Sequence, residues 1–226
     1  MSDNLPVTPV NVQQLLAERA QQMRSRLASA SADQIRINTS GGFTLPDGTS
    51  GAALSVVIVD VGSRNMYYDK GYTRGTVTPP SCFAAGKCHP DELVPSESSP
   101  SKQNADCRTC PKNQFGSAAT GKGKACKNQR VLALAMPDLT EDESKLYKLV
   151  VPPTSLKALD TYISTLIARG MDPMQVVTEV TCNTDKGYSV LSFRPIDAIE
   201  DTPRLTALFN LVPIAEQLIL TASGEE

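Results

Sequence analysis

Short apolar runs recur along most of this chain, and their pattern predicts β-strands. The run Ala53–Val61 is almost continuously apolar and rich in β-branched residues, which is typical of a buried strand. Gly62-Ser63 is interpreted as a turn into a further strand over Asn65–Tyr72. The alternation over Gln34–Pro46 breaks at Gly41-Gly42, which indicates a strand with a bulge or bend. Further strands are predicted at Val131–Met136, Leu146–Val151, Met174–Thr181 and Tyr188–Ile196, the last two as a hairpin.

Apolar residues at three- and four-residue spacing predict helices in three segments. The first is Asn11–Ala30, which follows a polar, loose arm over residues 1–9. The second runs from Ser155 to Arg169 and ends where Gly170 supplies a left-handed cap. The third spans Pro203–Ala222 and has proline at its first helical position.

The order of these elements predicts an α+β fold. Strands, a helix, two more strands and a final helix resemble the order of an oligonucleotide-binding (OB) barrel, whose antiparallel strands 1–3 precede a helix and strands 4–5. A generic sheet with flanking helices is the alternative. The predicted organisation is an N-terminal arm and helix (1–33), an OB-like core (34–200) interrupted by an insertion (81–130), and a C-terminal helix with a short acidic tail (201–226).

The insertion holds five of the six cysteines and the only histidine. It has almost no apolar run, so it cannot fold by burying a core of its own, and a bound metal can supply the missing stabilisation. A structural zinc site takes four thiolate or imidazole ligands. The preferred ligands are Cys82, Cys107, Cys110 and Cys126, with Cys88 or His89 as a possible replacement for one of them. An iron–sulfur cluster and free thiols are the alternatives, and Cys182 is expected to be a core thiol.

Charge is distributed unevenly along the chain. The formal net charge is −2, but residues 62–131 hold eleven of the 22 Lys and Arg and only five of the 24 Asp and Glu. A basic region on an acidic body is a footprint for a polyanion, although lysines in a solvated loop give the same pattern. The run from Gly116 to Gly123 is similar to a phosphate-binding loop, but it lacks the Ser or Thr that binds Mg²⁺ and the preceding strand, so nucleotide hydrolysis is not favoured.

Aromatic and basic residues alternate in the insertion and in the segment just before it. Proteins that bind single-stranded nucleic acid pair stacking rings with cations, and each stacked base contributes about 1–3 kcal/mol. Half-buried sheet tyrosines are the structural alternative. The predicted nucleic-acid-binding residues are Arg64, Tyr67, Tyr68, Lys70, Tyr72, Arg74, Lys112, Phe115, Lys122, Lys124, Lys127 and Arg130.

Catalysis is not expected from this sequence. The single histidine lies among the cysteines, so no Ser-His-Asp set is indicated, and no dense carboxylate cluster suggests a two-metal nuclease. No apolar run is long enough to span a membrane, and the first residues lack the pattern of a secretory signal. A reducing, cytoplasmic location is therefore expected, where a CxxC favours metal binding over a disulfide.

Two runs of the insertion resemble a pattern found in small proteins of tailed bacteriophages: Cys107-x2-Cys110-Pro111-x-Asn113-x2-Gly116-Ser117 and Gly121-Lys122-Gly123-Lys124-Ala125-Cys126-Lys127. The layout is also similar to phage single-stranded DNA-binding proteins whose OB fold carries a structural zinc. That resemblance implies a basic cleft, stacking aromatics and an acidic tail that contacts replication partners. Their zinc ligands include a histidine, whereas four cysteines suffice here, and the acidic tail is only Glu225-Glu226.

The sequence therefore predicts a non-catalytic single-stranded DNA-binding protein of phage replication, recombination or transcription, acting in the cytoplasm of an infected bacterium. Phage replication or transcription proteins are its expected protein partners. The alternative is a zinc-containing interaction module that docks on a phage or host polymerase. The sequence leaves the oligomeric state and the choice between DNA and RNA open.

Overall fold

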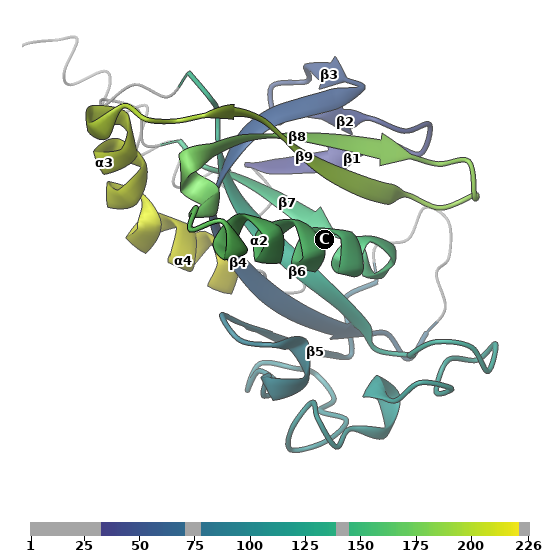
Figure 1. Cartoon of the computed structure of the whole chain (residues 1–226). Helices are drawn as coiled ribbons and strands as arrows, with labels where there is room; N and C mark the ends of the chain where they lie inside the picture. Colours follow the sequence, from purple (N-terminus) through teal and green to yellow (C-terminus); the bar gives the residue numbers. More distant parts are fainter. Residues whose placement is uncertain (1–32, 71–77, 139–144, 222–226) are drawn as a thin grey trace, which may run out of the picture.

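A single mixed sheet forms the centre of the molecule (Figure 1). The computed structural model describes residues 33–70, 78–138 and 145–221. Within them nine strands make one sheet in the order β3-β2-β1-β7-β6-β4-β8-β9, with β5 paired to β4 off this path. All pairs are antiparallel except β1 with β7. The strands are β1 Gln34–Ile37, β2 Phe43–Thr44, β3 Ser50–Gly51, β4 Ala53–Tyr67, β5 Cys82–Gly86, β6 Lys127–Ala135, β7 Tyr147–Val151, β8 Val176–Asn183 and β9 Val190–Ala198.

Three α-helices in the described residues cover the sheet. Helix α2 (Leu156–Ala168) packs on one face, and α3 (Thr202–Asn210) and α4 (Val212–Leu220) pack on the other. Four 3-10 turns complete the fold, at Pro90–Glu92 (η1), Pro111–Asn113 (η2), Pro153–Ser155 (η3) and Pro173–Gln175 (η4). The α+β class is thereby confirmed. None of the helices in the described ranges has the length and apolar character that crossing a membrane requires.

Strand β4 is buried on both faces, which explains its nearly continuous apolar run. Side chains alternate along a strand. Val56 and Ile58 therefore join the core under α2, which also holds Leu132 and Tyr162. Residues of β4 and β6 that face the other way, Val57, Val59, Val131 and Ala133, join the second core. There they pack with Leu208 of α3 and with Ala215 and Ile219 of α4.

The sheet curls into a half-barrel. The turn between β1 and β2 approaches the β8–β9 hairpin, although these strands are far apart in the strand order. A Cβ placed on Gly41 would lie 3.4 Å from the backbone oxygen of Cys182. Phe43, Val180 and Leu191 share the core under α2, so the curl encloses that core.

The predicted turn at Gly62-Ser63 is wrong, because β4 runs through it without a break. A Cβ on Gly62 would lie 2.0 Å from Cγ2 of Ile219 in α4. Glycine is needed here for the close approach of a helix to a strand, not for a turn.

Two other boundaries differ from the prediction. The bend at Gly41-Gly42 is a complete reversal, and β1 and β2 pair antiparallel across it. Both glycines have φ of 87°, a conformation that other residues rarely adopt. The predicted C-terminal helix is two helices with a break at Leu211, because Pro213 in the first turn of α4 has no amide hydrogen to continue the ladder of α3.

The insertion lies at one end of β4 and β6 (Figure 1). It begins with strand β5 and encloses a small apolar cluster of Ala84, Leu93 and Cys107. It therefore contains regular structure that its composition did not indicate. The predicted helix Asn11–Ala30, Tyr72, Arg74 and the acidic tail lie outside the described residues.

Candidate metal and nucleic-acid site

The two ends of the insertion meet at the end of β4. Cys82 in β5 pairs with Tyr67 on one side of β4, and Lys127 in β6 pairs with Met66 on the other side. Cys126 directly precedes Lys127. Sheet pairing thus brings together two cysteines that are far apart in sequence.

The CxxC segment is held against these strands by backbone hydrogen bonds. The Cys107 amide donates to the Leu93 oxygen at 3.0 Å, and the Cys126 amide donates to the Lys112 oxygen at 2.8 Å. Asp106 accepts hydrogen bonds from the backbone amide of Thr109 at 2.7 Å and from its hydroxyl, which closes the tight turn between Cys107 and Cys110. The turn is followed by η2, which has Pro111 at its first position.

Four cysteines line one small cavity, and they are the four that the sequence favoured: Cys82, Cys107, Cys110 and Cys126. Each is between 6% and 9% exposed, and all six cysteines of the chain are free thiols. Cys88 is exposed, and its neighbour His89 has a side chain that is 59% exposed. Neither residue lines the cavity, so the arrangement favours the four-cysteine set over one that contains Cys88 or His89.

The thiols of this cluster influence one another. Burial raises the pKa of Cys126 to about 12, and Cys107, Cys110 and Cys82 act in the same direction. Burial also raises the pKa of Cys107, against a hydrogen bond from the Asn65 side chain that lowers it. Without a cation both groups are neutral thiols at physiological pH.

Four thiols are suitable ligands for zinc, but their sulfur atoms are not arranged around one common position. Buried thiols free of disulfides are typical ligands of a structural zinc. Among the described residues, however, no three His, Cys, Asp or Glu side chains are placed so that they could hold a metal ion. The thiols line a common cavity, so a tetrahedral site would require them to move inward around the ion. Zinc therefore stays a prediction.

Three buried asparagines connect the cysteine segment to the sheet. The Asn128 side-chain nitrogen donates to the side-chain oxygens of Asn65 at 2.5 Å and of Asn113 at 2.9 Å. Asn113 donates to the backbone oxygen of Cys107 at 2.7 Å, and Asn65 donates to that of Pro90 at 2.6 Å. We call these three residues the asparagine network. No local pattern in the sequence indicated this network, because its members are bonded to segments far apart along the chain.

Three lysines lie over aromatic rings at the same end of the molecule. The Lys112 nitrogen is 5.3 Å from the centre of the Tyr67 ring, and the Lys127 nitrogen is 5.6 Å from that of Tyr68. A third pair, Lys124 and Phe115, is separated by 5.5 Å. Phe115 is 84% exposed, so its ring is accessible to a planar ligand. We call these six residues the aromatic–lysine surface.

The other predicted nucleic-acid-binding residues are placed less uniformly. Lys70 and Lys122 are exposed. Arg64 is 3% exposed and donates to Gln129 at 2.8 Å, so it lies beneath the surface. Arg130 has a side chain that is 14% exposed and lies 3.4 Å from Asp160, which ties β6 to α2.

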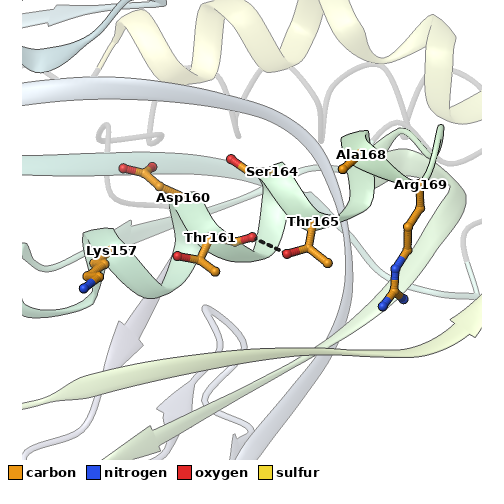
Figure 2. Close-up of a pocket in the computed structure, with 7 residues that line it drawn as sticks. All are labelled: Lys157, Asp160, Thr161, Ser164, Thr165, Ala168 and Arg169. Carbon is orange, nitrogen blue, oxygen red and sulfur yellow. Dashed lines mark hydrogen bonds between the residues drawn. The ribbon is translucent and has the colours of Figure 1, made fainter.

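A larger hollow follows the exposed side of α2 (Figure 2). Within the described residues one helix lines it, and its charged residues include Lys157, Asp160 and Arg169. Figure 2 shows Lys157 and Arg169 at opposite ends of the helix, and the hydrogen bond drawn is the local one from Thr165 to the Thr161 oxygen. The hollow is open and its polar groups do not converge, so it has less chemistry to offer than the cysteine cavity.

Comparison of the chain with protein-family models, with curated proteins and with solved structures gave no match.

Proposed function

We propose that this protein is a non-catalytic single-stranded DNA-binding protein, with a structural zinc that holds its insertion. The observation that supports the proposal is the aromatic–lysine surface. It combines the exposed ring of Phe115 and the half-buried rings of Tyr67 and Tyr68 with cations, and rings paired with cations are what single-strand binders use. The curled half-barrel is compatible with an OB-like fold, a common carrier of this activity.

Several lysines near the surface are available to phosphates. Within the described residues no ion pair is found for Lys70, Lys112, Lys122 or Lys127. Lys124 is different, because it lies 3.2 Å from Asp91 and its charge is partly neutralised. If about four lysines contact phosphates, the logarithm of the affinity falls with the logarithm of salt with a slope of about −3. A fourfold rise in salt then weakens binding by about fiftyfold.

Zinc would be held by Cys82, Cys107, Cys110 and Cys126. The ion would replace the missing hydrophobic core of the insertion and keep Phe115 and Lys112 in place against the sheet. It would have no catalytic role, because four cysteine ligands leave no open position for water or substrate.

Fluorescence anisotropy of a labelled thymidine oligomer tests the proposal, with a duplex of the same length for comparison. We expect tighter binding to the single strand and the salt dependence given above. Phe115→Ala removes one stacked base and should weaken binding by about 5- to 150-fold, since a stack contributes about 1–3 kcal/mol. Phe209→Ala is the matched control, because Phe209 is also exposed (66%) but lies on α3. Equal affinities of the two variants would refute the proposal.

The alternative prediction, a module that docks on a phage or host polymerase, gives a different result. A stable complex with a polymerase would then form without nucleic acid and would withstand the salt that releases the oligomer.

A further inference from the structure

The asparagine network adjoins both the cysteine cavity and the aromatic–lysine surface. Asn65 and Tyr67 are two residues apart on β4, so they point to the same face, and both line the cavity. Asn113 follows Lys112, whose side chain lies over Tyr67, and Asn128 follows Lys127, whose side chain lies over Tyr68. Each asparagine is therefore within two residues of a member of the surface.

The three asparagine side chains are almost inaccessible to water and are hydrogen-bonded to one another. Asn65, Asn113 and Asn128 are 1%, 2% and 9% exposed. Asn128 uses one side-chain nitrogen to donate to both other asparagines, so it is the link between them. Because a buried amide without partners is costly, these side chains have few alternative arrangements. A shift of one member has to be followed by the others.

The network also contacts the cysteine segment directly. Asn113 donates to the Cys107 backbone oxygen at 2.7 Å, and Asn65 lines the same cavity as the Cys107 thiol. Hydrogen bonds to ligating groups fix the orientation of metal ligands in proteins. Movement of Cys107 toward a bound ion would therefore be passed to both asparagines.

We propose that Asn65, Asn113 and Asn128 are positioning residues that couple zinc binding at the cysteine cluster to the order of the β4 and β6 ends, which carry Tyr67 and Lys127 of the aromatic–lysine surface. Zinc then raises the affinity for single-stranded DNA although no cysteine contacts the strand. By reciprocity the single strand raises zinc affinity by the same factor, about tenfold for a typical coupling. The part that concerns DNA rests on the proposed DNA binding, whereas the coupling of zinc to strand order rests only on the proposed zinc site.

Hydrogen exchange of the full chain, with zinc bound and after chelation, tests the coupling without any DNA. In the wild type, chelation should speed exchange in residues 62–67 and 127–130 as well as in the insertion. Asn128→Ala breaks the link between the other two asparagines. With zinc bound, as verified by native mass spectrometry, this variant should already exchange at those strand ends as fast as the zinc-free wild type.

Thr178→Val is the matched control. Thr178 is 0% exposed on β8 and shares a buried hydrogen bond of 2.7 Å with the Tyr162 hydroxyl, so its loss also removes a buried polar contact, but in the core under α2. This variant should keep the wild-type response to zinc. If Asn128→Ala fails to fold or to load zinc, Asn128→Ser, which keeps one donor, should show an intermediate response.

Two results would overturn the coupling. One is a wild type in which chelation affects the insertion and leaves residues 62–67 and 127–130 unchanged. The other is an Asn128 variant whose response to zinc equals that of Thr178→Val. Anisotropy of the same samples then tests the DNA part, where the tenfold zinc effect should be present in Thr178→Val and absent in Asn128→Ala. A wild type that shows the exchange effect but binds no single strand refutes the proposed function and leaves the coupling intact.

Discussion

The substitution Gly62→Ala, which adds one methyl group, tests whether glycine is required here by the close approach of α4 to β4. The added Cβ of Gly62→Ala would lie 2.0 Å from Cγ2 of Ile219 and 3.1 Å from the backbone oxygen of Gly86. Cγ2 is attached directly to Cβ in isoleucine, so it cannot swing away as the end of a flexible side chain can. Ile219 is 0% exposed, and α4 would have to move away from β4.

The size of the effect follows from two opposing contributions. Overpacking of a tight core costs about 1–3 kcal/mol. Replacing a glycine whose φ is not positive by alanine recovers about 0.4–1 kcal/mol through the unfolded chain, and Gly62 meets that condition. Gly62→Ala should therefore lower the free energy of unfolding by about 1–2 kcal/mol. Ile219→Ala alone should cost about 2–5 kcal/mol by leaving a cavity.

The double variant Gly62→Ala/Ile219→Ala shows whether Gly62 is needed for packing against α4 or for a turn. Ile219→Ala removes Cγ2, so Gly62→Ala should cost much less in that background. The contacts that are left are the Gly86 oxygen at 3.1 Å and the Cβ at position 219 at 3.3 Å. Urea unfolding of the four proteins at one fixed zinc concentration gives the coupling energy, expected at about 1–2 kcal/mol. If Gly62→Ala costs the same in both backgrounds to within about 0.5 kcal/mol, the argument from close approach is wrong.

Three further predictions concern the metal site and the core. Replacement of Cys82, Cys107, Cys110 or Cys126 by serine should abolish the zinc content measured by elemental analysis. Cys88→Ser should keep the wild-type zinc content, because Cys88 does not line the cavity. A Cys88→Ser variant that also loses its zinc would contradict the assigned ligands. Removal of zinc by a chelator should make the lysines of the insertion accessible to trypsin, while the far-ultraviolet circular dichroism signal of the sheet and helices is unchanged. If the trypsin resistance and the circular dichroism signal are lost together, the insertion and the core unfold as one unit, contrary to this prediction. Tyr162→Phe should cost about 1–3 kcal/mol by leaving the Thr178 hydroxyl unpaired in the core, and should cost clearly less in a Thr178→Val background, as measured by urea unfolding.

The apolar pattern located the sheet but not its limits. Both faces of Ala53–Val61 pack against apolar cores, so nearly every residue in it is apolar. The sequence alone therefore identified it as a buried strand. Residues 62–64 were missed as strand because Gly62-Ser63 is typical of a turn and Arg64 is charged. Ser63, Arg64 and Asn65 are nevertheless buried at 1%, 3% and 1% exposure, and their side chains bond to Arg130, Gln129 and Asn128 of β6. A local pattern cannot reveal partners that lie more than sixty positions away.

The same reasoning explains why the candidate site was only partly predictable. Cysteine spacing identified Cys107 and Cys110 directly, because a CxxC turn is a local feature, whereas sheet pairing places Cys82 and Cys126 beside them. The asparagines that support it gave no local signal, since each is bonded to a segment distant in sequence. Beyond residue 62, β4 no longer relies on apolar side chains alone; it is held by amide hydrogen bonds, by pairing with β5 and by the cysteine segment. A strand end fixed by polar contacts is stable only while all of its partners are in place. The part of the sheet that carries Tyr67 and Lys127 is therefore the part whose order depends most on the insertion and, if zinc binds as we propose, on the metal.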